Sequence, residues 1–178
     1  MVIRMFNLPM QSNKNNYTIP AQTRIGHVHL KVADLQRSLD FYCGLLGFEI
    51  QQRLGDQAAF ISAGGYHHHI GLNTWFSKGA PPAEKGAAGL FHTAIVYPTR
   101  ADLAAIFQRL REAGYPLTGA SDHGVSEAIY LDDPDQNGVE LYWDKPMDTW
   151  PLEADGTLSM YTRPLNLQDL LATLPAPE

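Results

Sequence analysis

A chain of 178 residues can form one domain with a substantial buried interior, or two small repeats that share a core. Its formal net charge of -6, with lysines and arginines scattered rather than clustered, argues against a nucleic-acid-binding surface. The single cysteine, Cys43, excludes an internal disulfide, and no apolar run suits a signal peptide or a membrane span. We therefore expect a cytoplasmic protein without a nucleic-acid or membrane partner.

The first half of the chain follows a βαβββ pattern. Residues 24–32 alternate with period two, which predicts a strand with His27 and His29 on one face. Asp34 is a suitable N-cap for a helix with an apolar stripe, and Gly47 is suited to end that helix. Three further strands are predicted at residues 48–54, 58–63 and 67–75.

The same pattern restarts in the second half. Residues 91–97 predict a strand containing His92, which lies 65 positions after His27 and at the matching place in its repeat. Thr99 and Asp102 predict a capping box at the start of a helix. Three strands follow at residues 116–119, 126–132 and 139–143.

These repeats predict an α+β fold in which two tandem βαβββ modules form one curled mixed sheet around a metal-binding cleft. Both modules belong to a single domain, residues 24–146. The C-terminal tail contains a possible short helix at 167–171, and we expect it to cover the core, a cleft or a neighbouring subunit. The expected boundaries are an N-terminal arm at 1–23, modules at about 24–76 and 90–146 with a linker at 77–89, and the tail at 147–178.

One predicted hairpin carries a carboxylate in an apolar strand. In residues 139–143, Glu140 and Tyr142 share one face while Val139, Leu141 and Trp143 share the other. A carboxylate there has to be solvated, paired or bound to a metal, because burying it bare is costly. From this hairpin alone, an edge strand with Glu140 in water is the simpler interpretation.

Superposing the two repeats adds partners for Glu140. The stretch GLNTW at 71–75 then lies over VELYW at 139–143, which places Leu72 where the second repeat has Glu140. The predicted cleft would be lined by His27, His92, Glu140 and Leu72. Two imidazoles and one carboxylate form the facial triad that holds non-haem Fe(II) and leaves positions open, and Leu72 argues against a fourth protein ligand.

Three further polar residues accompany the predicted triad. His68 lies an even number of positions before Leu72 and should project from the same face, while His123 lies in a turn before the strand that carries Tyr130. Imidazoles suit proton transfer and a tyrosine hydroxyl can donate to a bound oxygen. Taken alone, each is more simply a packed or surface residue. His67 and His69 are expected to face away from His68.

Four stretches resemble the vicinal oxygen chelate superfamily, and within it the catechol 2,3-dioxygenase-like type I extradiol enzymes. They are IGHVHLKVADLQRSLDFYCGLLGF, GGYHHHIGLNTW, GLFHTAIVYPTRADL and GASDHGVSEAIYLDDPDQNGVELYW, and the resemblance covers residues 24 to about 146. It implies that His27, His92 and Glu140 bind Fe(II), or sometimes Mn(II). A metal-dependent cleavage of a catecholic ring by O₂ is the expected activity.

The same resemblance implies roles for the remaining polar residues. His68 matches the acid–base residue of these enzymes, and His123 and Tyr130 match residues that contact the substrate and oxygen species. The spacing between His123 and Tyr130 is shorter than in the longest-known members. Many members join two such domains whereas this chain holds one, so it resembles the single-domain type or a half that assembles as a homodimer.

Other activities within the same superfamily remain alternatives. A glyoxalase-like isomerase is disfavoured by Leu72, which removes a fourth ligand. A thiol transferase would use the same His27, His92 and Glu140. Two alternatives do not require a metal: a small-molecule binding or resistance protein, and an interaction domain without a site. The presence of the complete set of polar residues argues against both.

Overall fold

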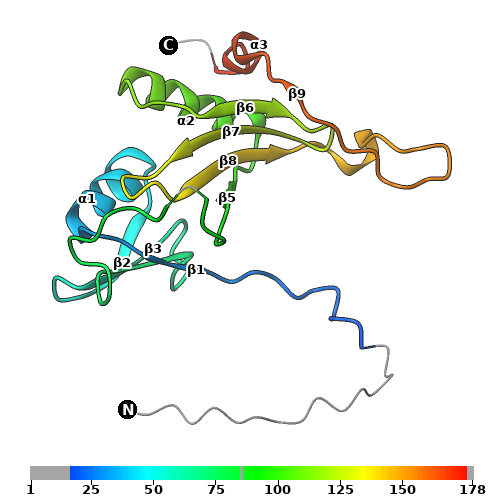
Figure 1. Ribbon diagram of the computed structural model, residues 1–178. Helices are drawn as coiled ribbons and strands as arrows, with labels where there is room; N and C mark the ends of the chain where they lie inside the picture. The colour runs from blue at the N-terminus through cyan, green and yellow to red at the C-terminus, as the bar shows by residue number, and fades with distance from the viewer. Residues whose placement is uncertain (1–16, 85, 176–178) are drawn as a thin grey trace.

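The chain folds into two βαβββ modules, which the computed structural model describes for residues 17–84 and 86–175 (Figure 1). Of the expected arm at 1–23, residues 1–16 lie outside this range, and 17–23 contain no helix or strand. The described residues of the predicted linker 77–89 likewise form neither helix nor strand. No helix in the described part of the chain has both the length and the apolar character needed to cross a membrane.

The helix of the first module is capped, as predicted. The side chain of Asp34 accepts a hydrogen bond from the Arg37 amide, and Gly47 adopts a φ of 87°, a left-handed conformation that suits glycine at a helix end. After Leu39 the helix widens into π geometry. The elements of this module are β1 (Val28–Lys31), α1 (Leu35–Leu39), η1 (Asp40–Leu45), β2 (Glu49–Leu54), β3 (Ala58–Ser62) and β4 (Ile70–Asn73).

The second module repeats this order and continues into the tail. Thr99 and Asp102 form the predicted capping box. The strand expected at 116–119 is found at 119–122, because Pro116 has no amide proton for a ladder. The elements are β5 (Thr93–Val96), α2 (Arg100–Glu112), β6 (Gly119–Asp122), β7 (Ser126–Asp132), β8 (Gly138–Asp144), η2 (Met147–Thr149), β9 (Arg163–Pro164) and α3 (Leu167–Leu171).

Each module forms its own sheet. The strand orders are β1-β4-β3-β2 and β5-β8-β7-β6-β9, with β1 parallel to β4 and β5 parallel to β8. The predicted α+β fold with two βαβββ modules is confirmed. The two sheets are separate hydrogen-bonded units rather than one continuous sheet, since no ladder joins them in the described residues.

One hydrophobic core unites the two modules. It contains Tyr42 and Leu72 of the first module together with Leu110 and Leu141 of the second, each fully buried. The tail closes this core, because Leu170 of α3 is also fully buried and α3 lies beside α2 (Figure 1). Burial of this apolar surface is the main force that holds the modules together.

A polar network fixes the turn between β7 and β8 to the first module. Asp135 Oδ1 accepts from the Ala33 amide at 3.2 Å and from Arg37 Nη2 at 2.5 Å. Tyr42 donates its hydroxyl proton to Asp133 Oδ2 across 3.1 Å, and both of these side chains are buried. The position of the β7–β8 hairpin therefore depends on contacts with α1.

Candidate active site

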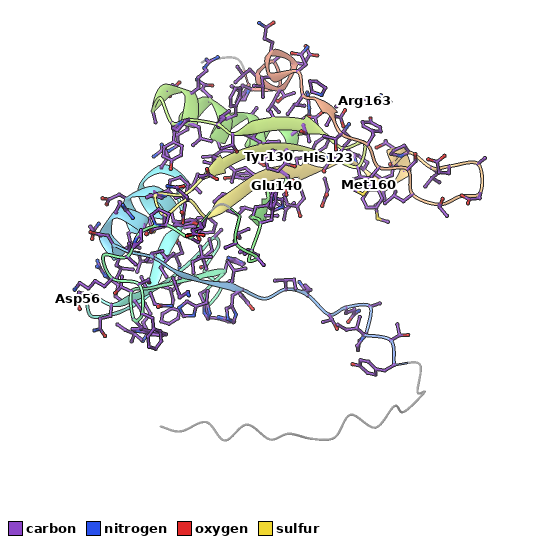
Figure 2. The ribbon with its side chains drawn as sticks, in the orientation of Figure 1. Asp56, His123, Tyr130, Glu140, Met160 and Arg163 are labelled. Carbon is purple, nitrogen blue, oxygen red and sulfur yellow. The ribbon has the colours of Figure 1, made fainter. Side chains whose placement is uncertain are left out.

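Four polar side chains of the second module form a continuous hydrogen-bonded chain. Figure 2 shows three of them, His123, Tyr130 and Glu140, close together. Tyr130 on β7 and Glu140 on β8 are direct register partners, and the Tyr130 hydroxyl donates to Glu140 Oε1 across 2.9 Å. His123 Nε2 lies 2.7 Å from the Tyr130 hydroxyl, and His92 Nε2 lies 2.9 Å from Glu140 Oε2. The structure thus brings together His92, His123, Tyr130 and Glu140, four of the six predicted site residues.

The alternation of β8 places Glu140 on the side opposite the core. Val139 and Leu141 are 1% and 0% exposed, whereas the Glu140 side chain is 13% exposed. Because β8 lies between β5 and β7, it is an interior strand. The simpler interpretation of Glu140 as a solvated edge residue is therefore wrong, and its carboxylate is paired.

Tyr130 is held in its protonated form. Burial is the main cause that raises the pKa of Tyr130, and the hydrogen bond to Glu140 and the charge of that carboxylate add to it. A raised pKa keeps the phenol protonated across the neutral range. The hydroxyl consequently remains a hydrogen-bond donor beside the carboxylate.

The C-terminal tail contributes to the same site. His123 Nδ1 lies 3.1 Å from the carbonyl oxygen of Tyr161 and 3.3 Å from the hydroxyl of Thr162. No motif in the sequence indicates a role for Tyr161 or Thr162 in the site. A backbone carbonyl has no side-chain signature, so no motif could have revealed this contact.

The predicted residues of the first module form a second group. His27 precedes β1 and His68 precedes β4, and their ring centroids lie 4.4 Å apart. His67, expected to face away, has its Nδ1 only 2.8 Å from Nδ1 of His68. The strand begins at Ile70, so its alternation does not extend to residues 67–69. Partial burial first, and then His27 and His67, lower the pKa of His68.

The strand register corrects the superposition of the two repeats. Glu140 pairs with Ala94 of β5, and the corresponding pair in the first module is Gly71 with His29. Leu72 instead corresponds to Leu141 and is buried in the core. A one-residue shift exchanges the faces of a strand, so Gly71 stands where the second module has Glu140. A Cβ on Gly71 would lie 2.9 Å from the His29 ring, which covers this place.

A cavity of about 690 Å³ lies between the first strands of the two modules. Of the four predicted cleft residues, His27 and His92 line it, whereas Glu140 and Leu72 are not among its lining residues. Tyr142, on the same face of β8 as Glu140, also contributes. No lysine, arginine, aspartate or glutamate is found among the described residues of its wall. The apolar part of the wall includes Ile25, Val28, Phe48, Leu90, Ile95 and Val96.

The donor set of the predicted metal site is partly assembled. Two ligand atoms about 2.1 Å from one ion and at right angles are about 3 Å apart. His92 Nε2 and Glu140 Oε2, 2.9 Å apart, match this separation. His27 lines the same cavity as His92, but within residues 17–84 and 86–175 no three potential ligand side chains converge closely enough to hold an ion. The fit is thus good for two of the three predicted ligands.

Comparison with known proteins identifies the family. Residues 24–141 match the sequence profile of the Glyoxalase/Bleomycin resistance protein/Dioxygenase superfamily. The chain belongs to this superfamily. Members described in solved structures share its fold, including a glyoxalase/dioxygenase from Nostoc punctiforme with a TM-score of 0.60, 18% identity and coverage of 75% of this chain and 100% of that one.

Curated relatives of the superfamily carry two kinds of activity in their names. A catechol-2,3-dioxygenase of Bacillus subtilis is 38% identical over 86% of this chain and 53% of its own length. A biphenyl-2,3-diol 1,2-dioxygenase of Rhodococcus globerulus is 33% identical over 70% of this chain and 64% of its own length. A lactoylglutathione lyase of Escherichia coli O157:H7 is 27% identical over 68% of this chain and 93% of its own length. The chain spans about half to two thirds of the two dioxygenases.

Proposed function

We propose that the chain is a metal-dependent extradiol dioxygenase that cleaves a catecholic ring with O₂. The observation that carries this proposal is the hydrogen-bonded chain from His123 through Tyr130 to Glu140 and His92. It joins two predicted ligands to two groups able to contact substrate oxygens. The similarity to catechol-2,3-dioxygenase at 38% identity supports the same reaction class.

His92 and Glu140, with His27 as the third ligand, would hold Fe(II), or alternatively Mn(II). When bound, the ion supplies Lewis acidity and electron transfer to the reaction. The remaining chemistry belongs to the protein. The Tyr130 hydroxyl fixes one oxygen of Glu140, so that the other oxygen, 2.9 Å from His92 Nε2, keeps its orientation.

Proton transfer falls to His68 and His123. The lowered pKa of His68 keeps its imidazole neutral at pH 7, which allows it to accept a proton. His123 Nε2 and the Tyr130 hydroxyl are 2.7 Å apart, so a substrate oxygen beside this pair could form hydrogen bonds with both groups. Tyr130 acts as the donor, since it remains protonated.

The cavity indicates the kind of catechol. At about 690 Å³ it is in the size range of sites for ligands larger than a single ring. The described residues that line the cavity include no lysine or arginine that could pair with a carboxylate. A carboxylate substituent on the substrate would therefore lose its hydration on binding and gain no ion pair in return. We infer a catechol with an uncharged, apolar substituent.

A glyoxalase-like isomerase is the second candidate, because lactoylglutathione lyases are among the relatives. The position of Gly71 speaks against it, since a second carboxylate ligand is absent there and the His29 ring covers the place. A thiol transferase and a metal-free binding protein are the further alternatives that the test has to separate.

The test is anaerobic purification with Fe(II), followed by a panel of catechols in air-saturated buffer. We expect oxygen uptake together with the absorbance of a ring-opened product. An alkyl- or aryl-substituted catechol should have a kcat/KM at least about 10-fold above that of a carboxylated catechol, which corresponds to about 1.4 kcal/mol. Iron binding without oxygen uptake on any catechol would exclude the dioxygenase and favour the transferase or isomerase. Absence of iron binding would favour the metal-free binding protein.

A further inference from the structure

His123 and Tyr161 contact each other at two points. The Tyr161 amide donates to the His123 carbonyl across 3.2 Å, and His123 Nδ1 lies 3.1 Å from the Tyr161 carbonyl oxygen. This pair continues the ladder between β6 and β9, in which Asp122 is paired with Arg163 (Figures 1 and 2). The tail is therefore attached at the residue that contacts Tyr130.

The ring contact decides which nitrogen of His123 carries a proton. A carbonyl oxygen can only accept a hydrogen bond, so the 3.1 Å contact with Tyr161 assigns the proton to Nδ1, whereas in the other tautomer Nδ1 would accept from the Thr162 hydroxyl 3.3 Å away. In the neutral imidazole the other nitrogen, Nε2, then carries a lone pair. That nitrogen lies 2.7 Å from the Tyr130 hydroxyl, whose single proton it then accepts in place of Glu140 Oε1.

Tyr161 is itself held by close packing. The guanidinium of Arg163 lies 4.0 Å from the centre of the Tyr161 ring, a cation–π contact. On the other side is Gly124, in the turn that follows His123. A Cβ at Gly124 would come within 2.8 Å of both Pro151 Cγ and Tyr161 Cε1, so only glycine allows the tail to approach this closely.

We propose that residues 159–164 are a positioning segment, which sets the tautomer and the orientation of His123 through the backbone carbonyl of Tyr161. Tyr161 touches no reacting atom in this scheme and acts only through His123. By leaving a lone pair on Nε2, the segment prepares His123 to accept a proton from Tyr130, or from a substrate hydroxyl that takes the place of Tyr130 as its partner. This consequence rests on the proposed function, whereas the tautomer itself does not.

The substitution Gly124→Ala tests the proposal with a matched control. Gly124 and Gly156 have nearly equal φ angles of 81° and 83°, so alanine imposes the same backbone strain at either position. A Cβ at Gly156 meets nothing within 4 Å, whereas a Cβ at Gly124 collides with the positioning segment. The difference between the two variants therefore reports the displacement of the segment.

The first readout is the tautomer of His123, measured from long-range ¹H–¹⁵N spectra of the imidazole and assigned with His123→Gln. We expect protonated Nδ1 in the wild type and in Gly156→Ala, and protonated Nε2 in Gly124→Ala. The second readout is turnover, which should fall about 10- to 100-fold in Gly124→Ala with little change in KM. Gly156→Ala should keep the wild-type kcat.

A wild-type His123 with protonated Nε2 would overturn the proposal. So would a Gly124→Ala protein in which Tyr161 loses its amide protection from hydrogen exchange while the tautomer stays the same. If the wild type shows the expected tautomer but cleaves no catechol, the proposed function fails and the positioning segment stands.

Arg163→Met provides a second variant in case Gly124→Ala does not fold. Arg163 is exposed and its guanidinium lies over the Tyr161 ring, so its loss weakens the segment without altering the turn at Gly124. We expect a partial loss of both the Tyr161 amide protection and the protonated Nδ1 signal, in parallel. Loss of one without the other contradicts the proposal.

Discussion

Tyr130 and Glu140 are partners in the β7–β8 ladder, and the hydroxyl of one donates to the carboxylate of the other across 2.9 Å. The contact links a proposed metal ligand to a proposed substrate contact through a single proton. Because the two residues are direct cross-strand neighbours, their geometry is fixed by the hairpin itself. The predictions below separate the ligand role from the donor role.

Tyr130→Phe should reduce kcat about 100-fold while leaving iron affinity within about 10-fold of the wild type. Phenylalanine fills the same space but has no hydroxyl to donate to Glu140 or to contact His123. Steady-state kinetics with a metal titration would check both expectations. Unchanged kcat would remove Tyr130 from the mechanism.

Tyr115→Phe is the matched control for that experiment. Its hydroxyl donates to the carbonyl oxygen of Asp132 across 2.8 Å, so it is also held at the β7 strand but outside the site. We expect a loss of stability of about 1 kcal/mol with kcat retained. Equal loss of kcat in both variants would indicate a structural effect.

Glu140→Gln should weaken Fe(II) binding by at least about 100-fold, because the amide keeps the shape of the side chain and removes the anionic ligand. Elemental analysis and calorimetric titration measure this without any turnover. Glu49→Gln, an exposed position on β2, should bind iron as the wild type does. Wild-type affinity in Glu140→Gln would exclude Glu140 as a ligand.

His68→Ala should retain metal and lose turnover by about 10²- to 10⁴-fold, the usual contribution of a general acid or base. The neighbouring variant His67→Ala removes an exposed imidazole 2.8 Å from His68 and serves as the control. We expect its kcat to fall less than about 10-fold. Full activity in His68→Ala would refute the assigned role.

Arg37→Met should lower the free energy of unfolding by about 1–3 kcal/mol, since it leaves the buried Asp135 without its charged partner. Urea unfolding followed by circular dichroism measures the change. Lys78→Met breaks a pair with Asp56 whose side chains are 74% and 80% exposed, and should cost less than about 0.5 kcal/mol. Equal effects would show that the Arg37 contact does not hold the turn.

Local patterns in the sequence identified much of the fold. Asp34, and Thr99 with Asp102, cap their helices as predicted, and β7 has the bounds expected for it. Such features depend on neighbouring residues and on the period of the hydrophobic pattern, both of which are visible in the chain. The repeat also indicated His92 as a partner of Glu140, because His92 lies at the same place in its module as His27 in the other.

Long-range packing decided the rest. The register of β4 made Gly71, rather than Leu72, the counterpart of Glu140, and a shift of one residue cannot be read from two short aligned stretches. His68 lies outside its strand, so alternation could not orient it.

The sequence by itself determined the α+β class, the two modules and the polar residues of the β7–β8 hairpin, since these follow from periodicity and from cross-strand neighbours. Only the tertiary structure decided that the tail reaches His123, that His67 contacts His68, and that His29 covers Gly71. These contacts join segments far apart in the chain, and they arise from how the modules and the tail pack on one shared core.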